Sequence, residues 1–132
     1  MGQLFDLDEV LQQLDIRSIH LPVVPETEHL ICKENIQKMK DGVFLINTAR
    51  WSIVNEKDVV EAIKTGKIRG FGTDVFEKEP VDVSGKLFQF PNYIATPHVA
   101  AETYENCEAT SIVTAKELLA VFEGKEPEYR LE

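Results

Sequence analysis

The sequence predicts an α/β fold in which an open parallel β-sheet lies between two layers of helices, giving three layers in all. Strand-like and helix-like segments alternate along the 132 residues, a pattern typical of parallel sheets covered by helices. The apolar run from Val43 to Ile46 does not alternate with polar residues, which favours a central strand buried on both faces. With 43% apolar residues the chain can bury one core, so residues 1–132 are expected to form a single domain.

The first half of the chain is expected to hold two short helices and two strands. Pro22 and Pro25 interrupt regular structure after the first strand, because proline cannot donate a backbone hydrogen bond. Gly42 opens the second strand. The expected ranges are 7–14 and 33–39 for the helices, and 16–21 and 43–46 for the strands.

The second half is expected to hold two helices and two further strands. Asn55, followed three residues later by Asp58, resembles a helix N-cap with an acidic first turn, and Gly66 is a typical residue just beyond a helix end. This helix should therefore extend to about Thr65. The remaining elements are strands at 68–75 and 93–95 and a long helix at about 102–123, whose apolar stripe contains Ile112, Ala115, Leu119 and Phe122.

Composition excludes several classes of function. The formal net charge of −9 would repel nucleic acid, and the longest apolar runs are only strand-sized, so no membrane segment is expected. Cys32 and Cys107 lie far apart, with no neighbouring ligands at metal-site spacing. We therefore expect reduced cysteines, no metal site and a cytoplasmic location.

Polar side chains gather immediately after the predicted strands. In open parallel sheets, ligands bind in the crevice beyond the carboxyl ends of the strands, so these positions are the first candidates for a site. The second, third and fourth strands would all deliver their following residues to the same edge. The residues concerned are Asn47, Thr48 and Arg50, then Asp74, Glu77 and Glu79, and finally Thr96 and His98.

Three of these residues have side chains that could act together in one reaction. The guanidinium of Arg50 can hold a planar carboxylate through two parallel hydrogen bonds. His98 can exchange a proton near neutral pH, and a carboxylate such as Glu79 on its other ring nitrogen would fix the tautomer. Taken singly, each residue is more readily explained as an ordinary surface or loop residue. Because a parallel topology brings all three to one edge, we favour a catalytic site.

At these residues the chain resembles the D-isomer-specific 2-hydroxyacid dehydrogenases, a family that includes lactate, glycerate and phosphoglycerate dehydrogenases. The resemblance covers nearly the whole chain and lies in a series of ordered segments. These are His20-Leu21-Pro22 with Glu26-Thr27, Met39-Lys40, Leu45-Ile46-Asn47-Thr48-Ala49-Arg50, Ile53-Val54-Asn55-Glu56, Thr65-Gly66-Lys67-Ile68, Asp74-Val75-Phe76-Glu77 with Glu79-Pro80, and Thr96-Pro97-His98 with Thr103.

The resemblance implies a role for each candidate residue. Arg50 would bind the substrate carboxylate, His98 would be the acid/base, and Glu79 would be its partner. NAD or NADP would be the cofactor, with Asp74 at the nicotinamide carboxamide. The loop from His20 to Pro22 and the turn Asn47, Thr48 and Ala49 would line the cofactor through backbone groups and small side chains.

Two departures from the family pattern limit what the resemblance implies. Trp51 follows Arg50, where the family has glycine, and a turn that needs a positive φ would be strained by the indole. The chain also has no G-x-G-x-x-G segment to cradle a pyrophosphate and no acidic residue ending a second strand to hold the ribose. The chain is thus expected to be the second half of a doubly wound, Rossmann-like sheet, the C-terminal half of a dinucleotide-binding domain with its C-terminal helix.

Two functions follow as hypotheses. In the first, the chain is the catalytic part of an NAD(P)-dependent oxidoreductase that interconverts a small 2-hydroxy acid and a 2-oxo acid, with weak cofactor binding and weak activity when alone. In the second, it is a non-catalytic truncated or engineered half-domain that acts as a binding or oligomerisation module. In either case the first strand is an exposed edge, which favours a homo-oligomer or a partner that supplies the missing half.

Overall fold

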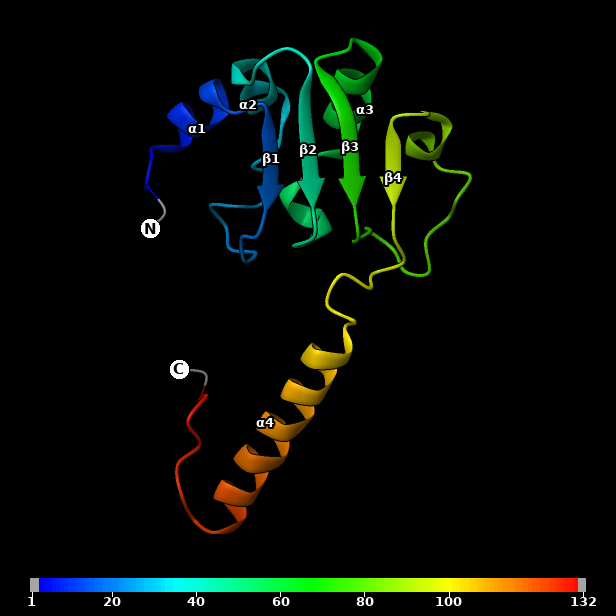
Figure 1. The fold of residues 1–132 in the computed structure, drawn as a ribbon. Helices are drawn as coiled ribbons and strands as arrows, with labels where there is room; N and C mark the ends of the chain where they lie inside the picture. Colours follow the sequence, from blue (N-terminus) through cyan, green and yellow to red (C-terminus); the bar gives the residue numbers. More distant parts are fainter. Residues whose placement is uncertain (1–2, 131–132) are drawn as a thin grey trace. The chain divides into compact units, whose positions relative to one another are not determined.

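The computed structural model describes residues 3–130 of the chain (Figure 1). It divides into two compact units, one ending at His98 and the other beginning at Val99. The expectation of a single domain over residues 1–132 stays a prediction.

The first unit is built on a sheet of four parallel strands. In chain order the strands are β1 (Ile16–Ile19), β2 (Val43–Asn47), β3 (Ile68–Thr73) and β4 (Tyr93–Ala95). Their order in the sheet is the same as their order in the chain, β1-β2-β3-β4, and every pair is parallel. The prediction of an α/β, Rossmann-like parallel sheet is confirmed.

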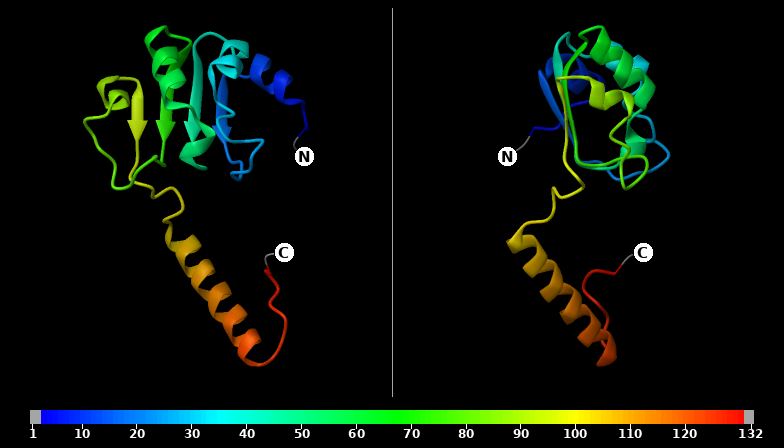
Figure 2. Two further views of the ribbon diagram at one scale, coloured as in Figure 1. Left: turned by 180° about the vertical axis from the view of Figure 1, so that it is seen from behind. Right: turned by 90° about the vertical axis from the view of Figure 1, so that its right-hand side faces the viewer.

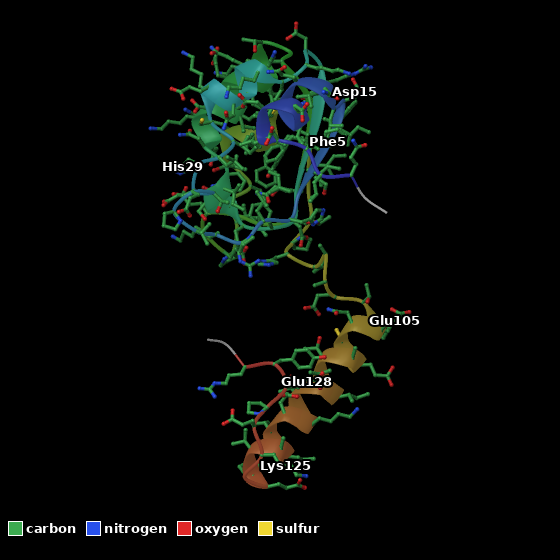
Figure 3. All side chains as sticks on the ribbon, turned by 90° about the vertical axis from the view of Figure 1, so that its left-hand side faces the viewer. Phe5, Asp15, His29, Glu105, Lys125 and Glu128 are labelled. Atoms are coloured by element: carbon green, nitrogen blue, oxygen red, sulfur yellow. The ribbon has the colours of Figure 1, made fainter. Side chains whose placement is uncertain are left out.

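Three helices, α1 (Leu7–Gln13), α2 (Lys33–Lys38) and α3 (Glu56–Lys64), lie against one face of this sheet. The right-hand view of Figure 2 shows α2 and α3 on one side of the strands, and Figure 3 shows α1 beside β1, with Asp15 labelled between them. The buried core lies between the sheet and this helical layer. It includes Leu11, Ile36 and Val59 from the helices and Val43, Leu45, Ile68 and Phe71 from the strands.

The opposite face of the sheet is open within the first unit. Its apolar side chains remain partly accessible: Ile16 is 61% exposed, Phe44 42%, Ile46 38% and Ile94 70%. The expectation that β2 is buried on both faces is therefore wrong, because burial alternates along the strand. Residues 3–98 supply one sheet layer and one helical layer, and the third layer is not among them.

Gly70 has a structural reason to lack a side chain on the open face. A Cβ at this position would lie 2.8 Å from Cδ1 of Phe44, whose ring crosses over β3 from the neighbouring strand. The guanidinium of Arg69 lies over the same ring, 5.7 Å from its centre. Gly72 is different, because a Cβ there would lie 4.0 Å from the nearest atom, Cγ1 of Ile46.

The predicted capping residues are found at both ends of α3. The Asn55 side chain accepts a hydrogen bond from the Asp58 N–H, as expected of an N-cap. Gly66, directly after the C-cap Thr65, has a φ of 78°, the left-handed conformation that favours glycine. The sequence did not predict the short 3₁₀ helices Trp51–Ile53 and Lys86–Gln89.

The second unit consists mainly of α4 (Tyr104–Phe122), within two residues of its predicted limits. The Thr103 hydroxyl accepts from the Asn106 N–H at 3.1 Å, and Gly124 after the helix has a φ of 71°. No residue of this helix is buried, so its apolar stripe is accessible: Leu119 is 59% exposed and Phe122 82%. In the part of the chain that the structure describes, no helix is long and apolar enough to cross a membrane.

Candidate active site

The candidate residues follow strands that end at the same edge of the sheet. In Figure 1 the arrowheads of β1 to β4 point to a common edge, below which the connecting loops run. Arg50 follows β2 closely, Asp74 comes directly after β3, and Thr96 comes directly after β4. The parallel topology therefore brings polar residues from three strands to one edge of the first unit.

The side chains of His98 and Glu79 are hydrogen-bonded to each other at this edge. Nδ1 of His98 lies 2.9 Å from Oε1 of Glu79 and 3.1 Å from Oε2. Both side chains are about half exposed, at 45% and 43%. Because Nδ1 faces the carboxylate, Nε2 is the ring nitrogen left for a reacting group.

The backbone of His98 is held in an uncommon conformation. Its φ is 58°, in the left-handed region that non-glycine residues rarely adopt. The His98 N–H donates to the carbonyl of Thr96 at 2.9 Å, across Pro97. Such conformations persist only where the surrounding structure fixes them, and they are concentrated at functional sites.

The loop that carries Glu79 is anchored by aromatic side chains. The ring of Phe76 stacks on Phe88 with centres 6.5 Å apart, and Phe88 meets the edge of Tyr93 at 5.2 Å. Tyr93 in turn packs against Phe71 of the core at 5.7 Å. Burial, with a smaller contribution from the Glu56 carboxylate, raises the pKa of Tyr93 to about 12. The β3–β4 connection is thus tied to the core on both sides of Glu79.

The turn that carries Arg50 is organised by Asn47. The Asn47 side chain accepts from the Ala49 N–H and donates to the Arg50 carbonyl, both at 3.0 Å. The Arg50 guanidinium is exposed and donates through Nη1 to the carbonyl of Ala49 at 2.7 Å. Among the ion pairs of residues 3–130 none involves Arg50, so its charge is available to an incoming anion.

The polar atoms of the Asn47 side chain bond within the turn. Its side chain is fully buried and both of its polar atoms serve the turn, while its carbonyl accepts from the Asp74 N–H at 3.0 Å and the Thr73 hydroxyl at 3.2 Å. Asn47 thus supports the turn that Thr48 and Ala49 form, and its expected place in the cofactor lining stays a prediction.

Asp74 is also buried, at 3% exposure, and joins the ends of neighbouring strands. Its carboxylate accepts from the Thr96 hydroxyl at 2.5 Å. The predicted contact of Asp74 with a nicotinamide stays a prediction.

A broad depression of about 1650 Å³ runs along the same edge of the sheet and over the helical layer. His20, Pro22, Thr48, Ala49 and Arg50 all contribute to its lining, whereas Asp74, Glu79 and His98 do not. The loop at His20 is ordered by hydrogen bonds, with the Ser18 hydroxyl 2.7 Å from Nε2 of His20 and the Thr27 hydroxyl donating to the carbonyl of Pro22 at 2.8 Å. The predicted cofactor loops thus meet in one hollow.

Trp51 does not strain the turn after Arg50. It begins a 3₁₀ helix, and the non-glycine residues with positive φ in the described chain are His29 and His98. The indole packs against the core, with its ring centre 6.5 Å from that of Phe71. The expected strain at this departure is therefore absent.

Sequence reasoning missed the role of Asn47, although a signal existed. Asparagine side chains often hydrogen-bond to the backbone two residues later and so form a turn. Asn47 ends a buried strand and is followed by the small residues Thr48 and Ala49, which is the setting where such a turn is expected.

Comparison with known proteins identifies the family of this chain. Residues 1–100 match the model of the D-isomer specific 2-hydroxyacid dehydrogenase NAD binding domain. The chain belongs to this family. Among its curated relatives, the glyoxylate reductase of Thermofilum pendens is 43% identical over 122 residues, which are 92% of this chain and 36% of that protein. The hydroxypyruvate reductase of Thermotoga maritima is 42% identical over 102 residues, covering 76% and 33%.

Solved structures of other proteins have the same fold over almost the entire chain. A protein of Thermus thermophilus superimposes with a TM-score of 0.89 at 37% identity, covering 97% of this chain and 41% of that one. The D-lactate dehydrogenase of Lactobacillus jensenii, solved with NAD⁺, gives 0.85 at 29% identity, covering 97% and 42%. The chain thus spans about two fifths of the length of these solved structures, and less of some other relatives.

Proposed function

We propose that this chain supplies the catalytic side chains of an NAD- or NADP-dependent oxidoreductase that interconverts a 2-hydroxy acid and a 2-oxo acid. The observation that carries the proposal is the Glu79–His98 contact of 2.9 Å at the sheet edge that also presents Arg50, in a chain of this family. Hydride transfer next to a carboxylate needs an acid/base and a group that binds the carboxylate. This chain provides both.

His98 is the proton-transfer group in this proposal. The Glu79 carboxylate accepts from Nδ1–H, which fixes the tautomer and the ring orientation. Nε2 then gives a proton to the carbonyl oxygen of the oxo acid during reduction and takes it from the hydroxyl during oxidation. Glu79 stabilises the imidazolium form by its charge and acts as a positioning residue.

Arg50 binds the substrate carboxylate. Its exposed guanidinium can form two parallel hydrogen bonds with a carboxylate, which fixes the oxo or hydroxy carbon relative to His98. Asn47 holds the backbone from which this side chain projects. Small 2-oxo acids such as glyoxylate and hydroxypyruvate are the proposed substrates, because the names of the relatives refer to them.

The residues present fit the nicotinamide end of a dinucleotide. His20, Pro22, Thr48 and Ala49 line one hollow beside Arg50, and they would hold the ring. When bound, the cofactor supplies or accepts the hydride. The sequence contains no glycine-rich phosphate loop, so this chain by itself should bind the cofactor weakly. Family structures are described with NAD⁺ and with NADPH, and the proposal includes both.

The partner in this proposal is a segment that completes the sheet beyond β1, or a second copy of the chain at the same edge. In doubly wound sheets with strand order 3-2-1-4-5-6, the strand that begins the second half lies beside the strand of the glycine-rich loop. β1 has a strand neighbour on one side, β2.

A cytoplasmic location also belongs to the proposal, since the free thiols Cys32 and Cys107 suit a reducing compartment.

A non-catalytic binding or oligomerisation module is the second candidate. It is supported by the accessible apolar side chains of the open sheet face, such as Ile16 and Ile94, which another protein could cover. In that case the Glu79–His98 pair would be inherited without being used.

The test is a chimaera in which this chain replaces the matching segment of the Thermofilum pendens glyoxylate reductase. We expect it to oxidise NADH or NADPH when glyoxylate or hydroxypyruvate is added. His98→Ala should lower kcat/KM by about 10²–10⁴-fold, the usual contribution of a general acid/base. The control is Lys40→Ala, because Lys40 has an exposed side chain that pairs with Asp15 and lines no part of the depression. A folded chimaera without activity would favour the second candidate.

A further inference from the structure

Thr96 is anchored at three points just after β4. Its N–H donates to the carbonyl of Thr73 at 3.0 Å, which continues the pairing of β4 with β3. Its hydroxyl donates to the Asp74 carboxylate at 2.5 Å, and its carbonyl accepts from the His98 N–H at 2.9 Å. A single residue therefore joins the end of β3 to the backbone of the proposed acid/base.

Asp74, which accepts from the Thr96 hydroxyl, is itself held in place. It is 3% exposed, and its N–H donates to the Asn47 carbonyl at 3.0 Å. The neighbouring Thr73 hydroxyl lies 3.2 Å from the same carbonyl and 3.0 Å from that of Val75. Hydrogen bonds in such buried networks are stronger than in water and restrict the chain to one arrangement. The ends of β2 and β3 thus determine where the acceptor for Thr96 lies.

The chain after Thr96 turns sharply. The hydrogen bond between the His98 N–H and the Thr96 carbonyl spans a single residue, Pro97, whose ring fixes its φ. His98 then has a φ of 58°, a conformation that costs free energy for a residue with a side chain. Because this conformation is unfavourable by itself, it requires support from the hydrogen bonds around it.

The contact with Glu79 is a weak means of holding His98. The two side chains are 43% and 45% exposed, and contacts of this kind contribute little, because solvent screens them and both side chains lose freedom. The Thr96 hydroxyl, in contrast, bonds to a buried carboxylate, and such charge-assisted bonds are about twice as strong as neutral ones. The backbone of His98 therefore determines more of the ring's orientation than Glu79 does.

We infer that Thr96 is a positioning residue for catalysis. Its hydrogen bond to Asp74 holds the turn at Pro97 and, through that turn, the left-handed backbone of His98. This backbone directs Nδ1 of the imidazole to Glu79 and leaves Nε2 for the substrate. The inference rests on the proposed function for the role of His98. It goes beyond that function because it assigns a task to a residue outside the acid/base, its carboxylate partner and the anion clamp.

Three variants separate the hydroxyl of Thr96 from its shape. Thr96→Val removes the hydroxyl and keeps the branched side chain, whereas Thr96→Ser keeps the hydroxyl. The matched control is Thr65→Val, because the Thr65 hydroxyl is also hydrogen-bonded, to the carbonyls of Glu61 and Ala62 at 3.1 and 3.2 Å. Thr65 lies between α3 and the start of β3, away from the carboxyl ends of the strands.

The first readout is NMR of the full ¹⁵N-labelled chain, which requires no turnover. A positive φ brings the N–H and Hα protons of a residue close together, so His98 should show a strong NOE between them. We expect this NOE in the unchanged chain, in Thr96→Ser and in Thr65→Val, and a weaker one in Thr96→Val. The ring of His98 should then also populate less of the tautomer protonated at Nδ1, because it no longer faces Glu79.

Two results of this measurement overturn the inference. One is an NOE in Thr96→Val as strong as in the unchanged chain. The other does not depend on a variant, and therefore decides the matter even where Thr96→Val does not fold. It is a Thr96 hydroxyl proton in the unchanged chain that exchanges too fast to be detected, which would mean that the bond to Asp74 is not maintained.

The second readout uses the chimaera described above. Thr96→Val should lower kcat about 10–100-fold, the effect of a misplaced catalytic group, and change KM less than about twofold, because Asn47 and not Thr96 organises the Arg50 turn. Thr96→Ser should restore most of kcat. An unchanged kcat, or a change confined to KM, overturns the positioning role. A chimaera that is inactive with Thr96 in place contradicts the proposed function, and the NOE alone then supports or overturns the positioning of His98.

Discussion

The two faces of the sheet carry similar side chains but are buried very differently. On the helix-covered face Val43, Leu45 and Phe71 are 0–1% exposed, whereas on the open face Phe44 and Ile46 are 42% and 38% exposed. These residues alternate along the same strands, so composition does not explain the difference. The apolar pattern of a strand therefore shows which side chains could be buried. Whether they are buried depends on a second layer that packs over that face of the sheet.

The largest expected effect comes from comparing neighbours on β2. Leu45→Ala should lower the free energy of unfolding by about 2–5 kcal/mol, because it leaves a cavity in the packed core. Ile46→Ala, one residue further and facing the open side, should cost less than about 1 kcal/mol. Urea denaturation of the two variants measures both values. Equal losses would mean that the open face is covered in solution, for example by self-association.

A smaller effect is expected at the two glycines of β3. Gly70→Ala should destabilise the chain by about 1–3 kcal/mol, because the new methyl group displaces the Phe44 ring. Gly72→Ala should be neutral or slightly stabilising, since its methyl group meets only ordinary contacts. In a Phe44→Ala background the penalty of Gly70→Ala should disappear. Its persistence there would show that the ring does not lie across β3.

The smallest expected effect on stability tests whether the helix-covered face of the sheet also buries Tyr93 in β4. The pKa of Tyr93, raised to about 12 by burial, exceeds the value of about 10 expected in the unfolded chain. The folded state therefore binds this proton more tightly, so the contribution is complete below pH 10 and is lost as the pH rises through 12. The loss should be about 1 kcal/mol, because the ring is only partly buried and solvent screens the charge. Tyr93→Phe should remove this step from a stability profile between about pH 9 and 12. An unchanged profile in the variant would place the phenol in solvent.

Much of the fold followed from local sequence signals. The strand Tyr93–Ala95 and the limits of α3 agree with the predictions, because prolines, glycines and the Asn55 cap mark their ends directly. The covering of β2 could not be predicted in the same way. Phe44 and Ile46 are as apolar as buried residues, and only the arrangement of distant segments decides whether a layer lies over them.

The candidate site was predictable in its residues but less so in its geometry. The parallel topology placed Arg50, Glu79 and His98 at one edge, and the structure brings Glu79 and His98 into contact. The inward direction of Asn47 and the 3₁₀ helix at Trp51 depend on hydrogen bonds and packing within the turn. Residue type and spacing do not specify these.

The measurement that tests the account most directly is the ratio of kcat/KM for the chimaera with His98 to that with His98→Ala, with glyoxylate as substrate. The Glu79–His98 geometry predicts an active chimaera and a ratio of about 10²–10⁴. A folded chimaera whose ratio is close to one, or one that has no activity with His98 in place, would contradict the assignment of catalysis to this chain.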